Sequence, residues 1–219
     1  MRKTIAKTMT ASLRNAAQLT HTASFDAANI LEYRKLLKNT PEYSGVTLTD
    51  MVLYAVTRTL PAFPALNAWL MEGDVLRTFN DVSLACAVDT ERGLMVPVIN
   101  NASGKSLLEL SRELKTLAEG CRNGTISPDL LTGGSFTVSN LGQYGVESFT
   151  PILNPPQTGI LGVCGITQRV RITGGQLAAY PAMPLSLTYD HRALDGAPAS
   201  KFLQTLCKNL ETFTTLLAG

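Results

Sequence analysis

The amino-acid sequence predicts an α+β fold of two layers, a mixed β-sheet with helices packed on one side. Three observations support this. The first sixty residues are mainly helical in pattern, runs typical of strands fill the middle of the chain, and a helical spacing of apolar residues returns after Ser106 and after Asp195. With 219 residues and no Pro-rich linker, internal repeat or low-complexity tract, the chain has the size of one domain, residues 1–219.

Three helices are predicted before residue 62. The first spans Thr4 to about Gln18. The second starts with Asp26 as its N-cap. Thr47, with an aspartate three residues later, resembles a capping box and opens a third helix that stops near Pro61.

Two later helices follow from apolar residues spaced 3, 4, 3, 4 along one face. One follows Ser106, with Ser103 expected as a cap, and the last starts near Asp195. The apolar positions are Leu107, Leu110, Leu114, Leu117 and Cys121, and then Leu203, Leu206, Leu210, Phe213 and Leu217.

Strands are predicted where the period changes to that of extended chain. NAWLMEGDVLRTF indicates two short strands around a turn, and VSLACAV and GLMVPVIN indicate a pair joined by DTER. GSFTVSN, TGILGVCGI, RVRIT and MPLSLTYD follow, separated by Gly-Gly and Pro-Pro pairs.

Charge and cysteine content exclude several classes of protein. Nineteen basic and seventeen acidic residues give a net charge of +2 without a basic cluster, so no nucleic-acid partner is expected. No stretch of 18 apolar residues occurs, so no membrane span is expected. The four cysteines lack C-x-x-C spacing and are expected to be reduced, buried and inert, with no metal site. The low charged fraction of 16% indicates that copies of the chain cover much of its surface.

The first 25 residues allow two interpretations. They contain Arg2, Lys3, Lys7 and Arg14 and no acid before residue 26, which is the composition of a mitochondrial transit peptide. The interpretation we favour is the first helix of the domain. Whether Met1 is the natural start is left open.

Several motifs resemble catalytic or binding sites without meeting their requirements. Gly104-Lys105-Ser106 follows a strand but lacks the glycine that a phosphate-binding loop needs at position 99. The spacing around His191-Arg192 differs from that of a kinase catalytic loop, and Ser135 lacks a hydrolase elbow. Asp190, His191 and Asp195 offer too few ligands on one face for a metal.

His191 is the strongest candidate for chemistry. It ends an apolar strand and precedes a helix, so packing holds its ring rigidly while it faces an open crevice. An imidazole titrates near neutrality, which suits a general base. The other histidine, His21, is expected to be structural. Asp195 is interpreted both as the N-cap of the last helix and as the partner of an arginine that fixes the His191 loop.

The segment containing His191 resembles the H-R-x-x-D-G signature of dihydrolipoyl acyltransferases, the core components of 2-oxo acid dehydrogenase complexes. RKTIAKTM, GLMVPVI, GGSFTVSNLGQYG and FTPILNPPQTGILGV resemble further landmarks of that family, in the family's order and over nearly the whole chain. The resemblance implies a chloramphenicol acetyltransferase-like fold and a homotrimer with active sites between subunits. Thr8 stands where the family often has arginine, which leaves Arg2 or Arg14 to pair with Asp195.

The resemblance also implies a reaction. An acyl group moves between the thiol of a dihydrolipoyl arm and coenzyme A, with His191 as general base and Ser139 as hydrogen-bond donor to the tetrahedral oxyanion. The lipoyl group is carried on a domain absent from this chain. The acyl group is not readable from the sequence; acetyl is our working choice over succinyl or branched-chain acyl.

The implied partners are a core of 24 or 60 subunits, lipoyl domains, a 2-oxo acid decarboxylase and a dihydrolipoyl dehydrogenase. The implied location is the bacterial cytoplasm, or the mitochondrial matrix in a eukaryote. Two alternatives are a free-standing acetyltransferase of the same fold and an inactive structural core protein. Asp190 stands where the former usually has a second histidine, and the latter is expected to have lost His191 or Ser139.

Overall fold

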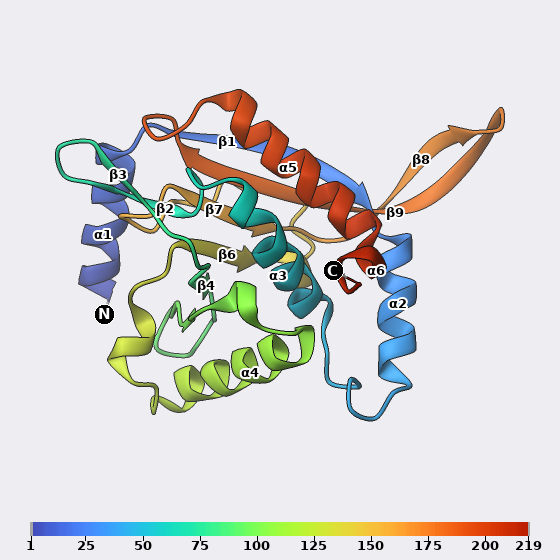
Figure 1. The fold of residues 1–219 in the computed structure, drawn as a ribbon, viewed down its shortest axis with the longest axis horizontal. Helices are drawn as coiled ribbons and strands as arrows, with labels where there is room; N and C mark the ends of the chain where they lie inside the picture. The colour runs from blue at the N-terminus through green and yellow to red at the C-terminus, as the bar shows by residue number, and fades with distance from the viewer. Residues whose placement is uncertain (1, 219) are drawn as a thin grey trace.

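A mixed sheet forms the centre of the molecule (Figure 1). The computed structural model describes residues 2–218, so Met1 lies outside the described residues. The strand order is β1-β9-β7-β6-β4-β5, with β8 paired to the first part of β9. Strand β6 runs parallel to β4 and β7, whereas the other pairings are antiparallel, which confirms the predicted mixed sheet.

The strands of this sheet are β1 (Gln18–Asp26), β4 (Leu84–Cys86), β5 (Val98–Ile99), β6 (Phe136–Asn140), β7 (Gly159–Val163), β8 (Thr167–Thr173) and β9 (Gln176–Asp190). A separate hairpin consists of β2 (Ala68–Met71) and β3 (Val75–Thr78), as predicted. The β8–β9 hairpin projects from the body of the molecule (Figure 1). It turns at Gly174-Gly175, both of which have positive φ, a conformation that glycine adopts without strain.

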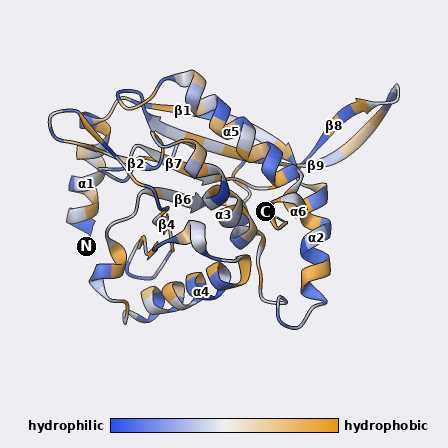
Figure 2. Cartoon of the chain, viewed as in Figure 1, coloured by the Kyte–Doolittle hydropathy of each residue, from blue (hydrophilic) through white to orange (hydrophobic). Residues whose placement is uncertain are grey.

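The helices are α1 (Arg2–Asn15), α2 (Ala28–Lys38), α3 (Leu48–Thr59), α4 (Leu107–Asn123), α5 (Gly196–Glu211) and α6 (Phe213–Leu216). Helices α3, α4 and α5 lie over one face of the sheet (Figure 1). Alternate residues of β9 point to that face, and Leu185, Leu187 and Tyr189 are fully buried in a core with Phe202 and Leu206 of α5. Figure 2 shows the matching alternation of polar and apolar residues along α4 and α5.

On the opposite face of the sheet, the loop of residues 146–157 packs against β7. Phe149 of this loop lies so close to Gly162 that a Cβ there would be 2.6 Å from its ring, which explains the glycine. Helix α1 docks on the same loop, where the buried Ser12 hydroxyl donates to Leu153 O at 2.7 Å. The predicted placement of helices on one side therefore holds for α3, α4 and α5.

Two predicted caps are wrong by one and three residues. The N-cap position of α2 is Ala27, because Asp26 is the last residue of β1, although its carboxylate accepts the N–H of Ala28 at 3.0 Å. Ser103 belongs to a short 3-10 turn, and Ser106 is the residue that caps α4. The capping box at Thr47 is confirmed.

All four cysteines are free and buried, as predicted. Burial raises the pKa of each thiol, for Cys86 and Cys207 to about 12, so these groups stay protonated at neutral pH. Within residues 2–218, every helix is too short or too polar to cross a membrane.

Candidate active site

His191 begins the turn that joins β9 to α5. Its backbone N–H donates to Ala17 O at 2.8 Å, which ties the turn to the residues between α1 and β1. Its side chain is 44% exposed. The imidazole packs against the ring of Tyr189, two residues earlier on the same face of the strand, with centroids 5.8 Å apart and ring planes at 39°. The imidazole is therefore held on one side and open to solvent on the other.

Asp190 anchors the His191 turn to the segment at Ala17. Its side chain is buried and accepts hydrogen bonds from the backbone N–H of Ala17 at 3.3 Å and of Arg192 at 3.1 Å. The Arg192 guanidinium donates further hydrogen bonds from Nε and Nη2, the shortest at 2.7 Å. Burial acts to raise the pKa of Asp190, but the hydrogen bonds and charge of Arg192 and the Ala17 N–H together hold it below its ordinary value.

Asp195 occupies the N-cap position of α5, as predicted, but its carboxylate makes no capping hydrogen bond. It is 86% exposed and lies 3.9 Å from His191 Nδ1. Contrary to the prediction, Asp195 pairs with no arginine among residues 2–218, and the carboxylate that holds Arg192 in this loop is the buried Asp190. Arg2 and Arg14 form no ion pair among residues 2–218.

His21 is a fully partnered histidine, as predicted, although it lies inside β1 rather than before a strand. Its Nε2 shares a hydrogen bond with the hydroxyl of Tyr189 at 3.2 Å, and its Nδ1 shares one with Ser200 Oγ at 3.0 Å. Both ring nitrogens are thus engaged.

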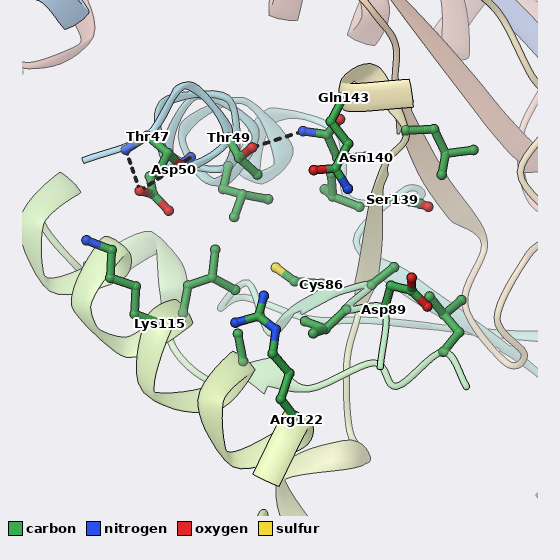
Figure 3. A pocket seen from close by; sticks show the side chains of 18 of the residues that line it. Thr47, Thr49, Asp50, Cys86, Asp89, Lys115, Arg122, Ser139, Asn140 and Gln143 are labelled. Carbon is green, nitrogen blue, oxygen red and sulfur yellow. Dashed lines mark hydrogen bonds between the residues drawn. The ribbon is translucent and has the colours of Figure 1, made fainter. Parts of the chain in front are cut away.

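Ser139 lies on β6 at the border of a cavity of about 840 Å³. The neighbouring Val138 points into the helix-side core, so alternation along the strand turns Ser139 to the opposite face. Figure 3 agrees, because the Ser139 hydroxyl points away from Cys86. The next residue, Asn140, fixes the end of β6: its amide donates to Thr49 Oγ1 at 2.9 Å and accepts the Gly142 N–H at 2.8 Å.

The cavity beside Ser139 lies between the start of α3, helix α4 and the ends of β4 and β6 (Figure 3). Leu53, Val88 and Leu114 contribute apolar wall. The charged lining is mixed, with Lys115 and Arg122 of α4 on one side of the balance and Asp50, Asp89 and Glu119 on the other. Burial, and secondarily the charge of Asp50, raises the pKa of the Cys86 thiol to about 12, so this sulfur is no nucleophile.

The chain does not bring its own His191 and Ser139 together. Ser139 is in register with Gly162, and Gly162 with Ser186, so the serine lies two strands away from β9 and five residues short of His191. With strands about 4.8 Å apart and residues about 3.3 Å apart along a strand, the two Cα atoms are roughly 19 Å from each other. Two side chains of this length cannot meet across that gap.

Two residues of the site were missed by sequence reasoning. Asp190 was considered as a metal ligand and as a replacement for a second histidine, but not as the ion-pair partner of Arg192. Asn140 gave no such signal, since its partner Thr49 is 91 residues away. Residues 2–218 hold no group of three His, Cys, Asp or Glu side chains placed to bind a metal.

Comparisons with known proteins agree on one family. The profile of the 2-oxoacid dehydrogenases acyltransferase (catalytic domain) matches residues 1–218. The acetyltransferase component of the acetoin cleaving system of Bacillus subtilis is 41% identical over 99% of this chain and 55% of its own length. The mitochondrial succinyltransferase component of the 2-oxoglutarate dehydrogenase complex of Saccharomyces cerevisiae is 39% identical over 96% of this chain and 46% of its own length. The chain spans about half the length of the curated relatives it matches.

Solved structures indicate the same family. Dihydrolipoamide acetyltransferase of Azotobacter vinelandii, studied for the catalytic role of one serine, one histidine and one asparagine, superposes with a TM-score of 0.94 at 34% identity, over 99% of this chain and 90% of that one. The cubic core of a pyruvate dehydrogenase complex gives the same values. In the Azotobacter enzyme the histidine follows the serine by 52 positions and precedes the asparagine by four. Here Ser139, His191 and Asp195 have the same spacing.

Chloramphenicol acetyltransferase shares the fold, with a TM-score of 0.58 at 14% identity over 94% of this chain and 93% of that one. The chloramphenicol acetyltransferase-like fold is thereby confirmed. From its profile, its relatives and its structure, this chain belongs to the family of 2-oxoacid dehydrogenase acyltransferase catalytic domains.

Proposed function

We propose that this chain transfers an acyl group between the thiol of a dihydrolipoyl arm and the thiol of coenzyme A. The observation that carries the proposal is the His191 turn: an imidazole fixed by its backbone and by a neighbouring ring, yet open to solvent. The spacing that Ser139, His191 and Asp195 share with the residues studied in the Azotobacter enzyme supports it.

His191 is proposed as the general base. An alkyl thiol with a pKa of about 8.5 is only a few per cent ionised at neutral pH, so a base that removes its proton accelerates attack by ~10²–10⁴. Asp195, 3.9 Å from Nδ1, is placed to favour the imidazolium that forms when the proton moves.

Ser139 is proposed to stabilise the oxyanion formed when the thiolate attacks the thioester carbonyl. A hydroxyl donor at that position contributes roughly 10²–10³ in rate. Because the serine and histidine of one chain lie far apart, the reaction centre is proposed to form between protomers of a homotrimer, with His191 from one and Ser139 from its neighbour.

The cavity beside Ser139 is the proposed binding site of coenzyme A. Its volume of about 840 Å³ is in the range of sites for large organic ligands. Lys115 and Arg122 on α4 supply positive charge for phosphate groups, and the apolar wall suits a pantetheine arm. The thiol end would then emerge beside β6.

The wider assembly is also proposed. A core of 24 or 60 subunits would receive acyl groups from lipoyl domains charged by a 2-oxo acid decarboxylase, and dihydrolipoyl dehydrogenase would reoxidise the arm. The proposed location is the bacterial cytoplasm, or the mitochondrial matrix in a eukaryote. Relatives of similar identity are acetyl- and succinyltransferase components, so acetyl stays a working choice.

A steady-state assay tests the function. We expect turnover with dihydrolipoamide and at least one of acetyl-, succinyl- or isobutyryl-coenzyme A, and a rate at least 10²-fold lower for His191→Ala. Thr22→Ala, at an exposed position of β1, is the control and should keep the wild-type rate. Equal rates with and without the imidazole, or turnover only with a small hydroxyl or amine acceptor, would refute the proposal.

A further inference from the structure

The only other histidine of the chain is connected to the candidate base through one side chain. His21 and Tyr189 meet edge to face, with ring centroids 5.1 Å apart and planes at 75°, in addition to their hydrogen bond. Tyr189 in turn forms the platform on which the His191 ring packs. The three rings form a continuous row from β1 to the start of the α5 turn.

Helix α5 closes over this row at its first residue. A Cβ added at Gly196 would lie 3.4 Å from His21 Cε1 and 3.4 Å from the Tyr189 hydroxyl. Ser200, one turn further along α5, engages the far nitrogen of His21 at 3.0 Å. The first turn of α5 therefore fixes His21, and His21 fixes the tyrosine hydroxyl.

The Tyr189 hydroxyl has one hydrogen-bond partner among residues 2–218, the Nε2 of His21. The tyrosine ring is fully buried. Burial, and secondarily the charge of Asp195, raises the pKa of Tyr189, which keeps the hydroxyl neutral and able to take part in a hydrogen bond. A buried hydroxyl without a partner is costly, so loss of His21 would favour a small shift of the Tyr189 ring toward another hydrogen-bond partner.

We propose that His21 is a positioning residue for the acyl transfer: through the hydroxyl of Tyr189 it holds the ring that orients the His191 imidazole. The inference rests on the proposed function, because it assigns His21 a task only if His191 is the base. It explains why a histidine within strand β1 has both of its ring nitrogens engaged in hydrogen bonds.

The test is a set of variants assayed with dihydrolipoamide and the best acyl-coenzyme A. His21→Ala and Tyr189→Phe should each lower kcat about tenfold, since small misplacements of a catalytic group cost up to about 10² in rate. KM for both substrates should stay within about twofold. His21→Gln, whose amide can take the place of Nε2, should recover kcat to within about threefold of wild type.

The double variant His21→Ala/Tyr189→Phe should be no slower than either single variant, because both remove the same bond. Multiplicative losses, an unchanged kcat in His21→Ala, or a raised KM with normal kcat would each overturn the proposal. So would failure of His21→Gln to recover kcat despite a wild-type melting temperature.

His191→Ala in the same assay separates this inference from the proposed function. If His191→Ala is inactive and His21→Ala is normal, only the positioning role falls. If His191→Ala turns over at the wild-type rate, the base assignment fails and the role of His21 falls with it. Thr22→Ala, next to His21 on β1, again serves as the control for a surface change on that strand.

Discussion

The two halves of the candidate site are built in different ways. The His191 turn is held by neighbours in sequence, with Asp190 and Arg192 on either side, and by the short segment at Ala17. Ser139 instead lies on an interior strand, and Asn140 holds the end of that strand through a contact to α3 91 residues away. One half is a locally braced turn at the end of β9, and the other depends on the packing of the whole sheet.

This difference bears on how the site is assembled. Each half is present in one chain, yet the sheet separates them by roughly 19 Å. Folding of the chain therefore prepares both halves, and under the proposed function association of chains would join them. Changes to either half should damage activity strongly, whereas changes to the bracing should act first on stability.

The largest effect that sharpens the comparison is expected for Ser139→Ala. Loss of the oxyanion donor should lower kcat by roughly 10²–10³ with little change in stability, as measured by steady-state kinetics and thermal unfolding. The control is Ser186→Ala. Ser186 lies on β9 directly opposite Gly162, which in turn lies opposite Ser139, so both serines are on the same face of the sheet. A Ser139→Ala enzyme within threefold of wild type would contradict the assigned role.

An intermediate effect is expected for Asp190→Asn, which removes the brace of the other half. The free energy of unfolding should fall by about 1–3 kcal/mol at pH 7; the figure is reduced from that for a fully buried pair because Arg192 is 44% exposed and solvent screens its charge. Asp129→Asn, an exposed acid, should change little.

This loss should depend on pH in a defined direction. The pKa of Asp190 is depressed in the folded chain, so its stabilisation is present above the ordinary value of 3.8 and is lost as the pH falls through the lower folded value. Urea unfolding at pH 7 and pH 3 should therefore show the wild type and Asp190→Asn converging at the acid end. A difference in unfolding free energy between the two proteins that grows as the pH falls would contradict the stabilising role of Asp190.

The smallest effect concerns the cavity on the Ser139 side. With a pKa of about 12, the Cys86 thiol is ionised to roughly one part in 10⁴ at pH 8, so iodoacetamide should leave it unmodified in the folded protein and alkylate it in urea. Peptide mass spectrometry measures both. Rapid modification of native Cys86 would mean that the cavity holds a reactive thiol and that the transfer has a covalent route.

Most helices and strands were predictable from the sequence because their signals are local. The 3, 4, 3, 4 spacing located α4 and α5, and Thr47 with Asp50 located the start of α3. The first half of β9 was missed, since its residues 176–182 pair with β8 in an exposed hairpin and carry no buried alternation. Asp26 was misassigned as a cap because strand pairing with β9 extends β1 through it.

The site was predictable only in part, because several of its contacts depend on burial and strand register rather than on local sequence. His191, Ser139 and Asp195 came from motif resemblance, and the fold places each at an element end or on a strand as expected. The acid that holds the arginine could not be chosen from spacing alone, because Asp190 and Asp195 both flank the loop and only burial distinguishes them. The contact of His21 with Tyr189 depends on the register of β1 against β9, which no local pattern encodes.

The most direct test mixes two inactive proteins. His191→Ala supplies intact Ser139, and Ser139→Ala supplies intact His191, so random trimers formed by unfolding and refolding them together should contain complete sites at about one interface in four. We predict recovery of about a quarter of the wild-type acyl-transfer activity, against the residual rates of the two variants refolded separately. Activity that stays at those residual rates, in trimers shown by mass to contain both variants, would contradict a site shared between protomers.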